Sequence, residues 1–520
     1  MENANSPAWR PDYWQAYLVP LWQRVADIYN GLHTDDVKKQ YLRPQLGEHK
    51  LVYEIRLGTA FENRLSPAVK SHAGLLSEFE LADDAPETLR QNIDNVDGQQ
   101  NSLQAFLLDW DISGLLYNAT LCLVDTPVAQ DESQQRRDRR PRFVHVPIKD
   151  VYAPRCVLDD GVLKIQMVSI KRCVTVDEGI FGRKDKDQYW VYWLQPLDTP
   201  INQNGILQNY AAYFQVWEKL EDGRKGQDGS EYAPVSEALQ MRDAGGRSLD
   251  TLPIVWYSPF GDPLLFHGVD NPMDRGGTPE YMPLVDLNIE YLNKHSELNT
   301  AESRCNYAML VKRYQGTRPE QESDMLSNGR VVILENGAEL FLLESEGTAI
   351  ASTREGQDRR LKQMDAISNA FLTGGEAERT ATEAIIESSQ SRLGLRNIAR
   401  RKESAVQQMC YWWERFANPS FNPFTDTVGG IEVSESVLNM PASPEQLRFW
   451  MDAWLNGALT ATEWKAKMRE LGEYTEEMEA AAEQPSTGLN LNFSGAQTNG
   501  NLSSGGSGEA GIDFEPVEGS

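Results

Sequence analysis

Apolar residues recur at helical spacing over residues 11–125, form strand-like runs over 143–258, and return to helical spacing from residue 281. Steps of three and four residues mark one face of a helix. Alternation, or runs of β-branched and aromatic residues, is typical of strands. The sequence therefore predicts an α+β protein in which helices come first, a β-rich block second and long helices last.

The region 11–125 is predicted to be mostly helical. Pro20 interrupts the first apolar row, which predicts two short helices or a kink, and Gly31 is a suitable stop. A second helix is expected to end near Pro67. The apolar positions that define these elements are Trp14, Leu18, Leu21, Val25 and Ile28 for the first row, Tyr53, Leu57, Phe61 and Leu65 for the second helix, Leu103, Phe106, Leu107 and Trp110 for a third helix, and Leu121–Val124 for a strand.

The block 143–258 is predicted to be a sheet. A loop rich in Gly and Asp, Glu221–Glu231, joins two of its strands as a hairpin, and residues 259–280 read as a linker because Gly, Pro and Asp dominate them. The expected strands are Phe143–Ile148, Leu163–Val176, Gln188–Leu194, Tyr210–Leu220 and Leu252–Tyr257.

The stretch 281–417 organises the rest of the chain. A helix is predicted from Pro283 to Cys305, and a second helix carries Leu361, Met364, Ile367 and Phe371. Between them lies a small β segment with Asn336-Gly337 as a hairpin turn. Its strands are expected at Tyr307–Tyr314, Arg330–Leu334 and Glu339–Leu343.

A very long helix is predicted from Ala381 to Ala417, where Asn418-Pro419 ends it. At 1.5 Å per residue it would be roughly 55 Å long. Its later half places Ile398, Ala405, Met409, Trp412 and Phe416 on one apolar stripe, whereas its earlier half is polar. Such a polar helix has little to bury against its own domain, so we expect identical neighbours to supply its contacts. The candidate inter-subunit residues are Arg392, Arg396, Arg400 and Arg401.

Beyond the long helix, Gly430–Val433 is expected to return a strand to the region formed by the N-terminal helices and the β-rich block, and two amphipathic helices follow within 441–484. The first begins at Ser443 and carries Leu447, Trp450 and Trp454, and the second begins at Thr460 and carries Trp464. Residues 485–520 are Ser, Gly, Asn and acidic residues with few core formers, which predicts a disordered acidic tail.

Charge narrows the possible functions. The 520 residues carry a net charge of −27, which argues against a protein that grips nucleic acid through its phosphates but does not exclude one that lets DNA pass. The arginine-rich stretch 136–142 is interpreted as a solvated loop because acidic residues are interspersed near it. Five scattered cysteines and an N-terminus without an apolar segment favour a reduced, cytoplasmic setting, and no run is apolar enough to span a membrane.

No chemical motif emerges from the sequence. A P-loop, an H-E-x-x-H motif and a Cys/His metal spacing are all missing, and the six histidines are isolated. The G-x-G-x-x-G pattern at 506–511 has neither the strand nor the helix that a dinucleotide site needs. Adjacent acids at Asp83-Asp84 and Asp159-Asp160 are interpreted as surface. We therefore predict a protein that is not an enzyme and has no catalytic residue, cofactor or metal.

The order of elements from residue 10 to about 480 resembles that of portal proteins, the head-to-tail connectors of tailed bacteriophages, and in particular a divergent subgroup. The closest resemblance is in Gly337-Ala338-Glu339 leading into a strand, in the helix Asp358–Phe371, and in Glu378–Ala384 entering the long helix. The resemblance implies a fold with these parts: 1–280 wing, 281–305 first stem helix, 306–352 clip, 353–372 second stem helix, 373–380 tunnel loop, 381–440 spine helix and return strand, 441–484 helical crown, and 485–520 tail.

The family's role implies a ring of about twelve copies at one capsid vertex of the virion, assembled in the host cytoplasm. DNA passes through the ring without sequence-specific binding, and the expected partners are further copies of the chain, the terminase motor, a head-tail adaptor and the capsid or scaffold protein. The clip contact candidates are Lys312, Arg313 and Arg318. The tunnel loop is Thr373, Gly374, Gly375, Glu376, Ala377, Glu378, Arg379 and Thr380.

Two questions stay open at the level of sequence. Arg379 either holds DNA transiently or forms a salt bridge to Glu383 of a neighbouring copy. The rival functions are another virion or head-completion protein and, from a different class, a phage-encoded nuclease or hydrolase, which would need convergent catalytic groups.

Overall fold

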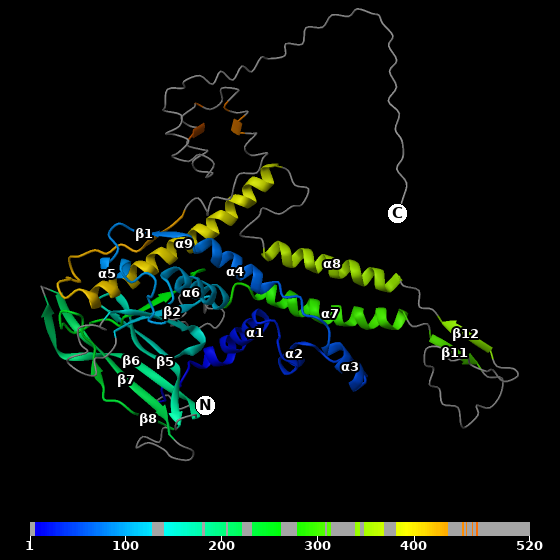
Figure 1. Cartoon of the computed structure of the whole chain (residues 1–520), viewed down its shortest axis with the longest axis horizontal. Helices are drawn as coiled ribbons and strands as arrows, with labels where there is room; N and C mark the ends of the chain where they lie inside the picture. The colour runs from blue at the N-terminus through cyan, green and yellow to red at the C-terminus, as the bar shows by residue number, and fades with distance from the viewer. Residues whose placement is uncertain are drawn as a thin grey trace, which may run out of the picture. The chain divides into compact units, whose positions relative to one another are not determined.

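The structure is a computed structural model, shown in Figure 1. It describes residues 6–126, 140–178, 182–203, 206–220, 231–261, 278–306, 309–313, 339–343, 348–368 and 381–434, with the single residues 450, 451, 454, 460, 464 and 465. Within these, only the backbone is described at 163, 178, 202–203, 206–207, 303–313, 339–349 and 381–393. The chain divides into two compact units, Met1–Pro441 and Ala442–Ser520.

Helices dominate the start of the first unit, as predicted. Their bounds are η1 Trp14–Leu18, a π-helical turn, α1 Val19–Tyr29, α2 Asp35–Tyr41, α3 Lys50–Leu57, α4 Leu65–Leu76, α5 Glu87–Arg90 and α6 Leu103–Tyr117. Next to Pro20 the helix changes type, from the π-helical turn to α1, but it is not divided into two separate helices as one of the expectations had it. Gly31, with φ of +81°, follows the end of α1. Ser102 caps α6 by accepting a hydrogen bond from Ala105 N at 3.2 Å.

One predicted helix is wrong. The row through Tyr53, Leu57, Phe61 and Leu65 is split, because α3 ends at Leu57 and a new helix, α4, begins at Leu65. Gly58 caps α3, and Phe61 lies in the connection. Pro67 lies in the first turn of α4, where its missing N–H costs nothing, so it belongs to the start of a helix and not to its end.

The largest sheet has six strands in the order β4-β5-β6-β7-β8, with β9 also paired to β7. Their bounds are β4 Val151–Asp159, β5 Val162–Glu178, β6 Gly182–Gln203, β7 Ile206–Lys219, β8 Tyr232–Pro234 and β9 Leu239–Gln240. All of these pairings are antiparallel. The strands expected at 163–176, 188–194 and 210–220 are therefore confirmed. The sequence pattern missed β4, whose alternation is broken by register shifts between Tyr152 and Cys156.

A second sheet, ordered β10-β2-β3, carries much of the core. Its strands are β2 Thr120–Asp125, β3 Arg142–Pro147 and β10 Ile254–Tyr257. Helix α6 packs on β2 and β3, and α9, Ala381–Ala417, packs on β10 and β2. The Trp110 and Tyr257 rings stack at 4.3 Å, which joins α6 to β10. This sheet therefore contacts both the N-terminal helices, through α6, and the long helix α9.

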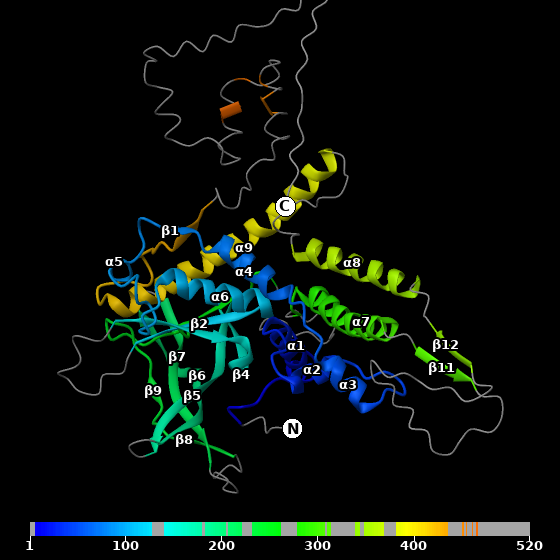
Figure 2. The same cartoon turned by 45° about the vertical axis from the view of Figure 1, so that its right-hand side comes forward.

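The predicted long helix is confirmed from Ala381 to Ala417, and its apolar stripe is buried. The helix predicted from Pro283 is α7, Met282–Asn306, and the next is α8, Thr348–Ser368, which begins earlier than expected. Between them β11, Met309–Arg313, pairs antiparallel with β12, Glu339–Leu343. Residues 330–337, with the predicted Asn336-Gly337 turn, lie outside the described residues. Figure 2 shows α7 and α8 side by side in a second view.

The predicted return strand is also confirmed. It is β13, Ile431–Val433, and it pairs antiparallel with β1, Phe79–Leu81. Backbone contacts continue this pairing, because Ala82 N donates to Gly430 O at 3.1 Å. The two-stranded sheet packs on α9. The sequence predicted the strand but not its partner.

In the second unit, Trp454 and Trp464 stack with their ring centroids 5.0 Å apart. Trp464 N donates to Thr460 O at 2.9 Å, a hydrogen bond with helical spacing. The predicted start of a helix at Thr460 is consistent with this contact. The acidic tail lies outside the described residues.

Candidate functional site

The α7 and α8 helices form an antiparallel pair. Arg360 Nη2 lies 2.7 Å from Glu290 Oε1, and Arg354 Nε lies 2.8 Å from Glu302 Oε1. The partner numbers run in opposite directions along the two helices, as an antiparallel pair requires. Met364 is fully buried. Because β11 and β12 lie between the two helices in the chain, they stand at the end of the pair where α7 finishes and α8 starts.

Helix α8 buries only a narrow stripe. Of its described side chains, Gln357 and Met364 alone are buried. The charged residues on its other faces are exposed, namely Arg354, Glu355, Asp358, Arg359 and Lys362. A helix usually hides about a 100°-wide stripe or more in its own domain. Most of the surface of α8 is therefore open in a single chain.

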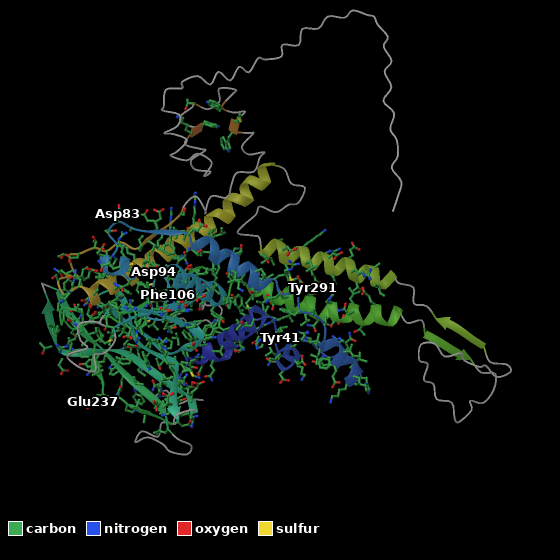
Figure 3. All side chains as sticks on the ribbon, in the orientation of Figure 1. Tyr41, Asp83, Asp94, Phe106, Glu237 and Tyr291 are labelled. Atoms are coloured by element: carbon green, nitrogen blue, oxygen red, sulfur yellow. The ribbon has the colours of Figure 1, made fainter. Side chains whose placement is uncertain are left out.

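Helix α7 has a second buried face toward the N-terminal helices. Arg56 of α3 pairs with Glu48 at 2.7 Å, and their side chains are 1% and 3% exposed. The same guanidinium donates to Ser296 Oγ on α7 at 3.0 Å. Asn293 donates to Tyr41 O at 2.9 Å. Figure 3 labels Tyr41 and Tyr291 near this joint. These polar contacts fix the axis of α7 relative to the helices that precede it in the chain.

His72 of α4 connects the other ends of the helix pair. Its Nδ1 and the Tyr281 hydroxyl share a hydrogen bond, and the two rings stack at 5.8 Å. The imidazole also interacts with the backbone of Ser368, the last residue of α8. Burial lowers the pKa of His72 to about 4, against the raising effect of that contact. His72 therefore joins the start of α7 and the end of α8 as a neutral side chain at pH 7.

The long helix α9 is fixed by a buried ion pair in its middle. Lys402 Nζ lies 2.6 Å from Asp111 Oδ2 on α6, and both side chains are 0% exposed. The ammonium also donates to Leu76 O at 2.6 Å. Burial raises the pKa of Asp111 to about 6, although Lys402 acts in the opposite direction. The pair joins α9, α6 and the end of α4 at one point.

A second charged cluster holds the end of α9. Asp243, whose side chain is 0% exposed, lies 2.8 Å from Arg247 and 3.6 Å from Arg415. Arg415 is in the last turn of α9, where a cation complements the helix dipole. Arg247 also donates to Phe421 O, just beyond the helix. The end of the long helix is thus held to the loop before β10.

The structure places the four arginines predicted at a subunit contact in different environments. Arg401 is engaged within its own chain: its Nη1 donates to Ser258 O at 3.4 Å, and its guanidinium lies against Gly261. Arg396 is half-buried, whereas Arg400 is exposed. Arg392 is on α9, but its side chain is not among those described. Arg400 and Arg401 are thus both exposed, and Arg401 is the one that is held by a contact to Ser258 within the chain.

The other predicted site residues are described in part or not at all. Lys312 and Arg313 lie on β11, paired with Leu340 and Glu339, and only their backbone is described. Arg318 and the tunnel loop, 373–380, lie outside the described residues. Arg140 and Arg142, from the basic run, are engaged locally with Asn92 and Asp125.

Neither a metal cluster nor a membrane helix is found where the structure describes the chain. Among those residues no three His, Cys, Asp or Glu side chains gather closely enough to hold a metal ion. No described helix is long and apolar enough to cross a bilayer. The described side chains thus form joints between helices.

The residues that form these joints were not singled out from the sequence. Asp111 lies within the apolar run of α6, and Lys402 lies between the apolar residues Ala399 and Val406 on α9. A charge inside an apolar stripe is the signal that could have indicated a buried ion pair. His72 carries a similar signal, because it lies between the core residues Val69 and Ala73.

One family model matches part of the chain. The family model described as "Domain of unknown function (DUF4055)" matches residues 282–417, from the start of α7 to the end of α9. No curated protein matches the chain.

Two solved structures resemble the chain at low similarity. One is described as "Neck of empty GTA particle computed with C6 symmetry"; it is 12% identical, has a TM-score of 0.35, and the match covers 83% of this chain and 95% of that chain. The other is described as "Virion of native gene transfer agent (GTA) particle", with 13% identity, a TM-score of 0.36 and the same coverage. TM-scores this low support no conclusion about function.

Proposed function

We propose that the protein is a portal, a ring of identical chains that forms the channel at one vertex of a tailed-phage capsid. The observation that carries this proposal is the sequence of elements α7, β11–β12, α8 and α9. An antiparallel helix pair capped by a small β element, followed by a helix of 37 residues, is the order that the portal resemblance implies for stem, clip, stem and spine.

The exposed surfaces of these helices favour a ring. Helix α8 keeps its charged faces open, and Arg400 is exposed on α9. Around a closed ring, each subunit would use two different faces, so that one face of α8 or α9 meets a neighbour's other face. Such contacts would cover polar helices that a single chain leaves in solvent. Oppositely charged side chains on these faces suit that arrangement.

The remaining roles belong to the same proposal. Duplex DNA would pass through the channel without sequence-specific binding, which suits a chain with a net charge of −27. Residues 373–380 would form the tunnel loop, and Lys312, Arg313 and Arg318 would face the terminase motor and then the adaptor. Rim charges of this kind steer association more than they add affinity. The wing and crown would meet the capsid or scaffold protein.

The oligomeric state tests the proposal. The purified full-length chain is measured by multi-angle light scattering across a range of concentrations and imaged by negative-stain microscopy. A portal forms closed rings with a central hole and a mass of about twelve chains. A monomer or dimer at every concentration, in the presence and absence of the capsid and scaffold proteins, would contradict it.

A further inference from the structure

A cavity of about 410 Å³ lies between the two larger sheets, against the loop that precedes α6. Strand β3 lines it with Arg142 and His145, and strands β5 and β6 line it with Arg172 and Trp190. Phe106, labelled in Figure 3, closes it from α6. The volume is within the range of small-molecule sites, and the lining combines aromatic rings with a few polar groups.

Arg172 has the most unusual environment in this cavity. Its guanidinium carbon lies 5.4 Å from the centre of the Trp190 ring, and its Nε is shielded from solvent. Within the described part of the chain, Arg172 makes neither an ion pair nor a hydrogen bond through its side chain. Shielding the Nε–H donor of a guanidinium from solvent without giving it an acceptor is costly. Burial accordingly lowers the pKa of Arg172.

Three other groups around the cavity, Arg142, His145 and Asp97, have direct partners. Arg142 lies 2.9 Å from Asp125. His145 Nε2 lies 3.1 Å from Thr120 Oγ1, and burial lowers the pKa of His145 to about 4, so it is neutral at pH 7. Asp97 accepts hydrogen bonds from Gln99 N at 2.7 Å and from Asn101 Nδ2 at 2.7 Å. By contrast, Arg172 has no direct hydrogen-bond or ion-pair partner among the described residues, although the carboxylates of Asp125 and Asp150 also act on its charge.

We propose that this cavity binds a single carboxylate group, with Arg172 as its anchor and the rings of Trp190 and Phe106 on its sides. A carboxylate matches the planar fork of a guanidinium and supplies the direct acceptors that Arg172 lacks. A phosphate dianion fits less well, because the exposed carboxylate of Asp109 also lines the cavity. This site is independent of the proposed channel, and it would bind its ligand in a single chain.

Acetate is the simplest probe. The full-length protein is treated with phenylglyoxal, which modifies accessible arginines, and the modification of Arg172 is followed by peptide mass spectrometry. Acetate is expected to slow that modification roughly threefold at about twice its Kd, and to raise the melting temperature. Chloride and phosphate at matched ionic strength are expected to have much smaller effects. Equal protection by phosphate and acetate, or none by either, would overturn the proposal.

Two variants separate binding from structure. Arg172→Met should melt no lower than the wild type without ligand, since it removes a guanidinium that has no direct partner among the described residues, and should lose the response to acetate. Arg183→Met, which removes an exposed arginine paired with Asp177 on the same sheet, should keep the response. A lower melting temperature for Arg172→Met without ligand would mean that Arg172 has a partner within the chain, and would overturn the proposal. Arg172→Lys provides a folded variant if the methionine does not fold.

The carboxylate could come from a free acid or from a polypeptide side chain, and the two sources are distinguished by a second titration. An acetylated, amidated tripeptide with a central glutamate presents the same group on a backbone. Tighter binding of the peptide than of acetate identifies a polypeptide carboxylate, and weaker binding identifies a small acid. Either result requires the same loss in Arg172→Met.

Discussion

Lys402 Nζ and Asp111 Oδ2 are 2.6 Å apart, and neither side chain is exposed to solvent. The ammonium lies 5.2 Å from the centre of the Phe79 ring on β1, in addition to its hydrogen bond to Leu76 O. A buried charge is tolerated only where partners surround it in this way. The long helix therefore has one defined position on α6 and not a range of sliding contacts.

Removing either partner alone should be costly. Lys402→Met leaves the Asp111 carboxylate buried without its cation, and Asp111→Leu leaves the ammonium without its anion, so each should reduce the free energy of unfolding by about 3–5 kcal/mol. The double variant should be closer to the wild type than either single variant. Urea unfolding followed by tryptophan fluorescence at fixed protein concentration measures all three.

An exposed ion pair provides the matched control. Lys39 and Asp36 lie 3.0 Å apart on α2, with side chains 49% and 91% exposed. Lys39→Met should change the free energy of unfolding far less than Lys402→Met does, because solvent screens the pair. If Lys402→Met cost as little as Lys39→Met, the buried pair would not fix α9.

How much of this arrangement could be predicted from the sequence depends on how far apart the interacting residues are along the chain. The C-terminal end of α9 was predictable because Asn418-Pro419 stops the helix locally. The partner of Lys402 was not, since Asp111 is 291 positions away and no local pattern joins them. For the same reason the partner of β13 was not predicted, since Phe79 of β1 pairs with Val433 far along the chain.

The proposed carboxylate site shows the same limit. Arg172 and Trp190 are predicted strand residues, and nothing in their spacing indicates that the cavity leaves one guanidinium unpaired. The clip was predicted from the family resemblance, and the row of arginines on the long helix was predicted from local charge. The tunnel loop lies outside the described residues. Helix existence and type thus follow from local pattern, whereas side-chain partners follow from packing.

Lowering the pH should reduce the free energy of unfolding through the protonation of His72. Its pKa is about 4 in the folded chain and 6.5 in an unfolded chain, so the unfolded chain binds more protons between these values. Stability from this group is therefore complete above pH 6.5 and is lost as the pH falls toward 4. At pH 5 the loss should be about 2 kcal/mol relative to pH 7.5.

The variant His72→Gln should reduce that loss, because glutamine has no proton to bind over this range. Unfolding in urea at pH 7.5 and pH 5 measures the difference. His33 is exposed, and His33→Gln is the control, expected to show the same acid sensitivity as the wild type. An unchanged acid sensitivity in His72→Gln would refute the assignment.

Two glycines should respond in opposite directions to alanine. A Cβ on Gly430 would lie 2.8 Å from the Gln407 backbone, so Gly430→Ala must push β13 away from α9. The expected cost is about 1–3 kcal/mol, the usual result of overpacking. Gly74 is inside α4 and has nothing within 4 Å of a built Cβ, so Gly74→Ala should stabilise by up to about 1 kcal/mol.

Hydrogen exchange locates the effect of Gly430→Ala. Amide protection should fall in β13 and β1 and remain unchanged in β5 and β6, which make no contact with the substituted residue. Uniform loss of protection, or none, would mean that the close approach of β13 to α9 is absent.

The proposed ring makes its sharpest prediction at Arg400. This side chain is exposed on α9, three turns before the buried Cys410, so a charge change there should leave the single chain intact. In a ring, the same side chain would face a neighbour, and Arg400→Glu would replace attraction by repulsion at every contact around the circle. We expect light scattering to show smaller species than the wild type at equal concentration, with an unchanged free energy of unfolding for dissociated chains.

Arg401 and Arg183 test whether the effect belongs to that surface. Arg183 is exposed on β6, away from the helices proposed to meet, and Arg183→Glu should leave ring mass unchanged. Arg401→Glu should lower the stability of the chain itself, because Arg401 contacts Ser258 and Gly261 within the same chain. If Arg400→Glu and Arg183→Glu reduced ring mass equally, net charge would explain the loss, and α9 would have no part in the subunit contact.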